Sequence, residues 1–233
     1  MRQGNQLVEW LRKEGWPSPS VLLLRHAARS MSQTSSWNDN DPLTPEGEDD
    51  AENMGQSLFS YSEIRVYYSP LHRCRETARY IERGARSRGV PSVTVKENPV
   101  LGSRYFVSKQ RALNLADQVG VERFARLWLD NKMPEGVIVN AKSALDEHLK
   151  LIGRALSSSS NESRLSVLIT HDWNVLLVRE SILSLRHETV GWPGFLEGIA
   201  VTREGSSEVR FEYVSQVGER MRILELGPPS HFL

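Results

Sequence analysis

The chain has 233 residues, and 29 Lys and Arg balance 29 Asp and Glu, so its formal net charge at pH 7 is zero. This balance excludes a non-specific nucleic-acid binder, which needs a net basic surface. The hydrophobic fraction of 39%, the single cysteine and the polar segment 1–14 without a signal-peptide core predict a cytoplasmic globular protein with no membrane partner.

The N-terminal half alternates between predicted helices and strands. Residues 6–14 have an amphipathic pattern typical of a helix, and four consecutive apolar residues at 21–24 predict a strand covered on both faces. Thr44 as N-cap, with Pro45 and several acidic residues after it, predicts a helix that runs to about residue 60. The next predicted elements are a strand at 64–68, a helix at 73–88 and a strand at 92–95.

Residues 97–147 interrupt this alternation with prolines and glycines around one predicted helix near 109–129. We expect this segment to form a small cap over the edge of the sheet. The remaining predicted elements are a helix at 141–156, a strand at 165–169 and a terminal hairpin of 199–201 with 209–211. The pattern predicts one α/β domain over residues 1–233, in three layers, with a mainly parallel sheet and helices on both faces.

Polar residues follow three of the predicted strands, at the edge where open α/β sheets bind ligands. The first strand leads into Arg25, His26 and Arg29. Two neighbouring cations favour a neutral, nucleophilic imidazole, and they are suited to hold a phosphate. The second strand leads into a helix that begins near Arg73, a position that disfavours a cation unless an anion binds there.

A third predicted strand ends in His171 and Asp172. Two strand-end histidines, three arginines and one carboxylate together suit phosphoryl transfer through a phosphohistidine. One imidazole attacks phosphorus, the arginines and the second histidine neutralise the phosphoryl oxygens, and a carboxylic acid protonates the leaving alcohol.

The segment Arg25-His26-Ala27-Ala28-Arg29 resembles the Arg-His-Gly-x-Arg signature of the histidine phosphatase (phosphoglycerate mutase-like) superfamily, with Ala27 where glycine is usual. Ser69-Pro70-Leu71-His72-Arg73 resembles the second block of that family, and His171 follows a strand as its second histidine does. The resemblance covers most of residues 21–172. It implies that His26 is the phosphorylated nucleophile. The groups that it assigns to phosphoryl binding are Arg25, Arg29, Arg73 and His171.

Two residues are candidates for the general acid. Asp172 fits the His-Asp motif of the acid phosphatase and phytase branch, whereas Glu97 stands near the glutamate position of the mutase-like branch. The residues around Glu97 match that branch poorly, so we favour Asp172.

The sequence therefore predicts a phosphatase that hydrolyses a small phosphate monoester without metal or cofactor. A mutase-like phosphotransferase and a non-catalytic module that binds a phosphorylated ligand are the alternatives. Cys74 lacks the spacing to an arginine that cysteine phosphatases need, and the other histidines lack metal-ligand spacing. Two further groups of residues are candidates for contact with the substrate beyond its phosphate. Residues 192–197 with Trp173 either line the substrate pocket or pack around a turn. Arg104, Tyr105 and Lys109 either contact the substrate or lie on the solvated surface.

Overall fold

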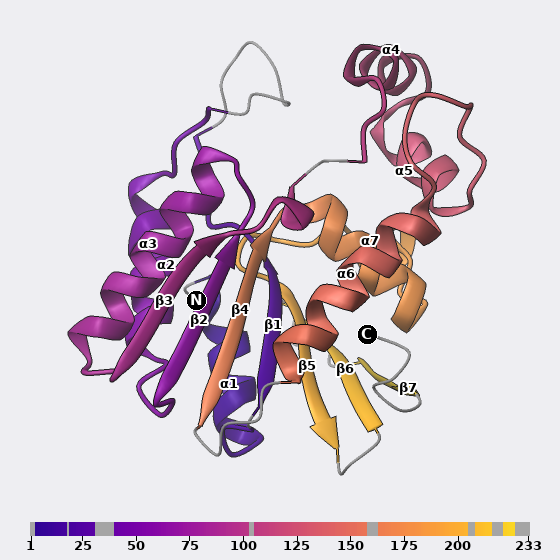
Figure 1. Ribbon diagram of the computed structural model, residues 1–233. Coiled ribbons are helices and arrows are strands. Elements are labelled where there is room, and N and C mark those ends of the chain that lie inside the picture. Colours follow the sequence, from indigo (N-terminus) through magenta and orange to yellow (C-terminus); the bar gives the residue numbers. More distant parts are fainter. Residues whose placement is uncertain are drawn as a thin grey trace.

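A seven-stranded sheet lies between two layers of helices in the computed structural model, which describes residues 3–17, 19–30, 40–102, 105–157, 163–204, 208–215 and 221–226 (Figure 1). The elements in chain order are α1 (Asn5–Lys13), β1 (Ser20–Arg25), α2 (Pro45–Gln56), β2 (Glu63–Tyr68), α3 (His72–Ser87), β3 (Ser92–Glu97), the 3₁₀ turn η1 (Pro99–Leu101), α4 (Lys109–Val119), α5 (Val121–Leu129), α6 (Ala141–Leu156), β4 (Arg164–Thr170), α7 (Asp172–Leu183), α8 (His187–Val190), β5 (Gly198–Glu204), β6 (Glu208–Val214) and β7 (Met221–Leu226). None of the helices in these described segments is both long and apolar enough to cross a bilayer.

The strand order in the sheet is β3-β2-β4-β1-β5-β6-β7. The four strands β3, β2, β4 and β1 pair in parallel, and β5, β6 and β7 continue the sheet in antiparallel pairs from β1. The predicted α/β class and the hairpin of β5 with β6 are confirmed. The sheet is evenly mixed and not mainly parallel as predicted, because β5 pairs antiparallel with β1 and the antiparallel strands β6 and β7 follow it. The sequence did not predict β7 or α7.

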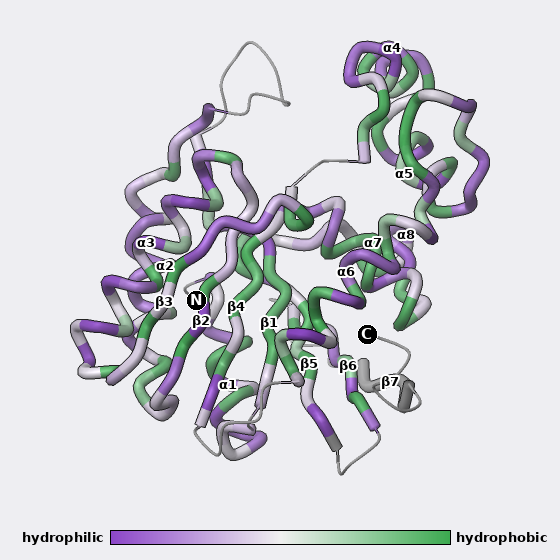
Figure 2. The backbone as a smooth tube through the Cα atoms, viewed as in Figure 1, coloured by the Kyte–Doolittle hydropathy of each residue, from purple (hydrophilic) through white to green (hydrophobic). Residues whose placement is uncertain are grey.

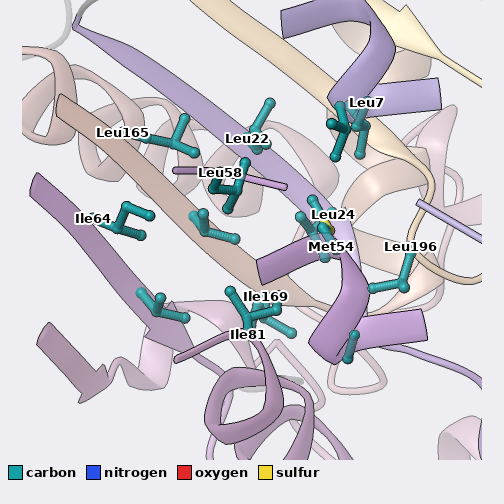
Figure 3. Close-up of a cluster of buried hydrophobic side chains, with 14 of the residues drawn as sticks. Leu7, Leu22, Leu24, Met54, Leu58, Ile64, Ile81, Leu165, Ile169 and Leu196 are labelled. Carbon is teal, nitrogen blue, oxygen red and sulfur yellow. The ribbon is translucent and has the colours of Figure 1, made fainter. Parts of the chain in front are cut away.

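Alternate side chains of β1 enter two apolar clusters, one on each face of the sheet. Leu22 and Leu24 pack with α1, α2 and α3, in the cluster that Figure 3 shows. Val21 and Leu23 pack on the opposite face with α6 and α7. A strand that is buried on both faces must be apolar at every position, which explains the uninterrupted run at 21–24 and its hydrophobic colouring in Figure 2.

The segment between η1 and α6 contains two helices where the sequence predicted one. Gly120 separates α4 from α5 with a φ of +83°, a conformation that cannot continue a right-handed helix and that suits glycine. Phe124 and Trp128 are fully buried in a separate apolar cluster that reaches Leu177 of α7. Figure 1 shows this segment on the side of the molecule where β1 and β4 end.

Gly47 in the first turn of α2 lies against the backbone of the loop after β1. The carbonyl oxygen of Ala28 accepts a hydrogen bond from the N–H of Thr44 (2.9 Å), and a Cβ on residue 47 would collide with that same oxygen. This contact holds the start of α2 against the loop that contains His26.

We expect Gly47→Ala to lower the free energy of unfolding by about 1–3 kcal/mol, because the helix and the loop must separate to admit the methyl group. Glycine-to-alanine changes at compatible sites ordinarily raise that free energy by about 0.4–1 kcal/mol. Urea denaturation measures the difference. Asp49→Ala, on the exposed side of the same helix, is the matched control. A Gly47→Ala protein more stable than wild type would contradict the prediction.

Candidate active site

Three loops with polar residues meet at one edge of the sheet, because β2, β4 and β1 are consecutive strands. The backbone N–H of His26 donates to the carbonyl of Thr170 at the end of β4 (2.9 Å). On the other side of β4, the N–H of Ser69 donates to the carbonyl of Ile169 (3.0 Å). The residues that follow the three strands, His26, Ser69 and His171, are therefore neighbours.

His26 is only 3% exposed, and its hydrogen bonds select one tautomer. Nδ1 lies 2.7 Å from the carbonyl oxygen of Ala27, which can only accept, so Nδ1 carries the proton. Nε2 accepts a hydrogen bond from Nε of Arg73 (3.0 Å) and therefore carries the lone pair. Burial lowers the pKa of the imidazole well below its usual value, and it is lowered further because His26 and His171 cannot both be charged so close together and because Arg25 and Arg73 are positively charged. The ring is thus neutral, with a nucleophilic nitrogen that faces a guanidinium group.

His171 caps α7 and is held at both ring nitrogens. Nδ1 lies 3.3 Å from Nη2 of Arg73, which can only donate, and Nε2 lies 2.8 Å from Oγ of Ser69. Nε2 therefore carries the proton and donates it to the Ser69 hydroxyl. Burial lowers the pKa of His171 well below its usual value, and the positive charges of Arg73 and Arg25 lower it further. The ring centroids of His26 and His171 are 5.6 Å apart, so both imidazoles border the same guanidinium group.

Arg73 lies in the first turn of α3, where Thr77 fixes the helix against the loop after β1. The Thr77 hydroxyl donates to the carbonyl of Arg73 (2.7 Å) and accepts from the backbone N–H of Ala27 (3.1 Å). A cation at a helix N-terminus is electrostatically unfavourable in the absence of an anion. The arrangement of Arg73 and the two histidines therefore favours a bound anion.

Arg25 and Asp172 form a partly exposed ion pair beside these groups. Nη2 of Arg25 lies 3.3 Å from Oδ2 of Asp172, and the two side chains are 17% and 27% exposed. Oδ1 of the same carboxylate accepts from the backbone N–H of Trp173 (2.9 Å). Arg25 also donates to the carbonyl of Pro193 (2.8 Å), and its guanidinium lies over the ring of Phe195 at 4.1 Å. The carboxylate is thus held at the site and is still open to solvent.

Arg29 forms an ion pair with Asp41, and both side chains are largely buried. Asp41 is a partner that the sequence did not predict. The charge of Arg29 lowers the pKa of Arg25 and of His171, although it is a smaller cause than burial in both cases. Arg29 therefore lies within electrostatic reach of the predicted phosphate site.

The loop before β5 contributes an aromatic wall to the site. The ring of Phe195 lies 5.7 Å from that of His26, between centroids. Glu197 secures this loop, because its Oε2 accepts from the N–H of Gly194 (2.7 Å) and from the hydroxyl of Tyr213 (2.9 Å). Phe195 is therefore a residue of the site. The sequence indicated it only within residues 192–197, for which packing and substrate contact were both possible.

The other candidates for substrate contact have different positions. Trp173 and Trp192 pack against each other at 5.3 Å between centroids, and Trp192 also contacts His187. Tyr105 is buried in the cap cluster, whereas Arg104 lies outside the described residues. The two tryptophans thus contribute to packing between α7, α8 and the cap.

The two candidate acids occupy different strands. Asp172 follows β4, which pairs directly with β1, the strand that leads to His26. Glu97 is exposed at the end of β3, the edge strand, which lies three strand intervals from β1. At about 4.8 Å per interval this corresponds to about 14 Å between backbones. The topology therefore favours Asp172 as the carboxylate nearer to His26.

Cys74 is fully buried beneath the site, with Sγ 3.6 Å from the carbonyl oxygen of Thr170. Burial raises the pKa of this thiol to about 12. The thiol is therefore protonated at neutral pH, which makes it a poor nucleophile.

Glu180, His187 and Glu188 are grouped closely enough to suggest metal ligands, with their ligand atoms within 4.8 Å of one another. Arg126 supplies the positive charge at this position, because its Nη2 lies 2.6 Å from Glu180 and 2.8 Å from Glu188. The cluster is thus a salt-bridge network between α5, α7 and α8.

Comparison with protein families decides the classification of the segment that holds His26 and Arg73. Residues 21–98 match the model of the histidine phosphatase superfamily (branch 1). This segment of the chain is thus similar to the histidine phosphatase superfamily. The predicted superfamily is thereby confirmed for the segment from β1 to the end of β3. The matched model is that of branch 1, so the likeness of His171 and Asp172 to the acid phosphatase branch stays a prediction.

Several solved structures share this fold. YhfR from Bacillus stearothermophilus is 16% identical with a TM-score of 0.58, and the match covers 84% of this chain and 96% of that protein. A mycobacterial glucosyl-3-phosphoglycerate phosphatase is 15% identical with a TM-score of 0.54, covering 78% and 89%. A putative α-ribazole-5′-P phosphatase from Escherichia coli is 14% identical with a TM-score of 0.51, covering 84% and 96%. No curated protein sequence matches the chain. These likenesses show the α/β fold that the chain shares with those proteins.

Proposed function

We propose that this protein hydrolyses a small phosphate monoester through a phosphohistidine on His26. The observation that carries the proposal is the tautomer of this buried imidazole, in which Nδ1–H donates to Ala27 and the Nε2 lone pair faces Arg73. A nucleophile needs a free lone pair at the operating pH, and the lowered pKa of His26 supplies it.

In the first half-reaction, Nε2 of His26 attacks phosphorus, a P–N bond forms and the ester P–O bond breaks. Arg73 is positioned to leave its contact with the lone pair and to bind the phosphoryl oxygens. Arg25 and His171 flank the same space, and His171 can donate from Nδ1 once it accepts a proton. Cationic donors fixed in a buried site stabilise the charge on a transferring phosphoryl group without a metal ion.

Asp172 is the general acid in this scheme and protonates the leaving oxygen. It forms an ion pair with Arg25, and a phosphate that draws Arg25 to itself would break that contact and leave Asp172 beside the ester. In the second half-reaction, water attacks phosphorus while the Asp172 carboxylate takes its proton. The P–N bond then breaks, and His26 returns to the neutral form.

The decisive experiment is to trap the phosphoenzyme. The protein is mixed with a ³²P-labelled phosphate ester, quenched and precipitated, and we expect a protein-bound label that is stable in base and labile in acid. Two of the structures with this fold are named as phosphatases for different phosphate esters, which agrees with a hydrolase.

The two alternatives give different results in the same assay. A phosphotransferase would form the label but pass it to a second alcohol rather than to water. A module that only binds phosphorylated ligands would retain them without any covalent label. Either result would contradict the proposed hydrolysis.

A further inference from the structure

The loop before β5 contacts Arg25 through both its side chain and its backbone. The guanidinium donates from Nη1 to the carbonyl of Pro193 (2.8 Å) and lies 4.1 Å from the centroid of the Phe195 ring. The backbone N–H of Arg25 donates to the carbonyl of Glu197 (3.0 Å), and its carbonyl accepts from the N–H of Leu196 (3.1 Å). The position of this guanidinium at the proposed phosphate site therefore depends on the conformation of the loop.

That conformation is unfavourable for the sequence that adopts it. Leu196 has a φ of +54°, in the left-handed region that favours glycine, and its side chain is buried in the core. A leucine persists in this region only where the surrounding structure holds it there. The loop therefore needs contacts that fix its backbone.

The carboxylate of Glu197 supplies these contacts from a buried position. Its Oε2 accepts from the backbone N–H of Gly194 (2.7 Å) and from the hydroxyl of Tyr213 in β6 (2.9 Å). A Cβ built on Gly194 would lie 3.0 Å from the carboxyl carbon of Glu197, so the carboxylate fills the inside of the turn. One carboxylate oxygen thus joins the start of the turn to the sheet.

A buried cation lies behind this carboxylate. Arg179 of α7 is fully buried, and its guanidinium lies 4.9 Å from the centroid of the Tyr213 ring. Its Nη2 donates to the carbonyl of Gly191 (2.7 Å), a few residues before the same turn. Buried charges are ordinarily accompanied by opposite charges, and hydrogen bonds to a charged group are stronger than those between neutral groups. The carboxylate therefore holds the turn more firmly than a neutral amide would.

The charge of Glu197 also acts on Arg25 itself. Burial lowers the pKa of Arg25, whereas the negative charges of Asp172 and Glu197 raise it. Asp172 is partly open to solvent and gives up its contact with Arg25 in the proposed reaction. Glu197 is buried in the turn, so it is the counter-charge that stays with Arg25 when a phosphoryl group binds.

We infer that Glu197, with Tyr213 as its partner, is a positioning residue that holds Arg25 in place for the phosphoryl group. It acts through the loop that contacts Arg25 and does not itself contact the substrate. The inference rests on the proposed function, since it concerns how the same site binds the phosphoryl group.

The binding of inorganic phosphate to Glu197→Gln, measured by titration calorimetry, tests this role through the sign of the change. Loss of a negative charge near an anion site would by itself strengthen phosphate binding. Loss of a hydrogen bond that fixes the loop displaces Arg25 and weakens it. We expect the second effect to dominate and the Kd for phosphate to rise about tenfold.

Two further variants complete this comparison. Tyr213→Phe removes only the hydroxyl that binds Glu197, so it should also raise the Kd, by a smaller factor. Glu212→Gln is the matched control, because Glu212 is equally buried in β6 and alternation along the strand places it on the face opposite Tyr213. This control should not raise the Kd.

The same substitutions in an Arg25→Met background show whether the effect passes through Arg25. Without the guanidinium, neither Glu197→Gln nor Tyr213→Phe should raise the Kd further. A general loss of structure would weaken binding by the same factor in both backgrounds. That result, or a Kd that is unchanged or lower in Glu197→Gln and Tyr213→Phe, would overturn the inference. If Glu197→Gln does not fold in thermal unfolding, Tyr213→Phe alone decides the comparison.

Phosphate binding does not require turnover, so these measurements separate the role of Glu197 from the proposed chemistry. Weaker binding in Glu197→Gln, with no phosphoenzyme in wild type, would retain the positioning role and reject the hydrolase. Phosphoenzyme formation in wild type, with unweakened binding in Glu197→Gln, would reject the positioning role alone. A wild-type protein that does not bind phosphate would overturn both.

Discussion

His26→Ala is expected to abolish the phosphoenzyme label and to lower kcat by at least about 10⁴-fold. The lone pair on Nε2 of this imidazole faces Nε of Arg73 at 3.0 Å. Alanine removes the nucleophile and leaves the guanidinium groups in place, so phosphate binding should persist while turnover stops. Quenched-flow trapping with a labelled ester measures the label, and inorganic phosphate competition measures the binding.

His72→Gln is the matched control for that variant. His72 is a neighbouring histidine at the start of α3, partly exposed and paired with Glu76. Its replacement should leave the label intact. Thermal unfolding of both variants separates the loss of a nucleophile from the loss of the fold. A His26→Ala protein that still carries an acid-labile label would assign the nucleophile to another residue.

The pH dependence of the first half-reaction tests the same assignment. Burial and neighbouring cations hold the pKa of His26 well below that of a free histidine, so the lone pair is present throughout the ordinary range. The burst rate should therefore not fall as pH is lowered through about 6.5, where a free imidazole is protonated.

The edge of the sheet that forms the site could be predicted because short parallel strands leave clear signals. The run at 21–24 predicts a strand that is covered on both faces, and the histidine and arginines after it lie at the edge where such sheets bind ligands. Because β1 and β4 are adjacent in the sheet, the two histidines that follow these strands lie close together. Recognising the two strand ends was therefore enough to predict that His26 and His171 share one site. Ser69 had a signal too, as a hydroxyl at the end of a predicted strand, but its partner His171 lies 102 residues away.

Other parts of the site depend on contacts that no local pattern encodes. Phe195 lies beside His26 because Glu197 binds Gly194 and Tyr213, a set of hydrogen bonds that closes a loop. The break between α4 and α5 at Gly120 could not be predicted from the local pattern either, because one glycine within an amphipathic pattern is compatible with a continuous helix. Its positive φ follows from how α4 and α5 pack in the cap cluster.

Asp172→Asn is expected to slow the step that releases the alcohol, and the loss should depend on the leaving group. Asparagine has nearly the same shape and keeps an oxygen that can accept from Trp173, but it cannot supply an acidic proton. An alkyl phosphate releases a strongly basic oxygen that requires protonation, so its burst rate should fall by about 10²–10⁴-fold. p-Nitrophenyl phosphate releases a stabilised anion, and its burst rate should change far less.

The same substitution should slow the second half-reaction for every ester, because the phosphoenzyme is common to all of them and loses its general base. With p-nitrophenyl phosphate we therefore expect a fast burst of p-nitrophenol followed by slow turnover, with the label accumulated in the steady state. Loss of the ion pair with Arg25 affects both esters alike. The ratio of the two burst rates therefore isolates proton transfer from phosphate binding.

Glu97→Gln makes the same change of charge at the other candidate acid. Because Glu97 is exposed at the end of the edge strand β3, its replacement should leave both burst rates and their ratio unchanged. A loss that depends on the leaving group in Glu97→Gln, with a normal ratio in Asp172→Asn, would transfer the acid to β3. That result would also require the end of β3 to approach the end of β1 during the reaction, although two strands separate them in the sheet. The comparison of the two variants therefore also tests whether the sheet edge keeps this arrangement during catalysis.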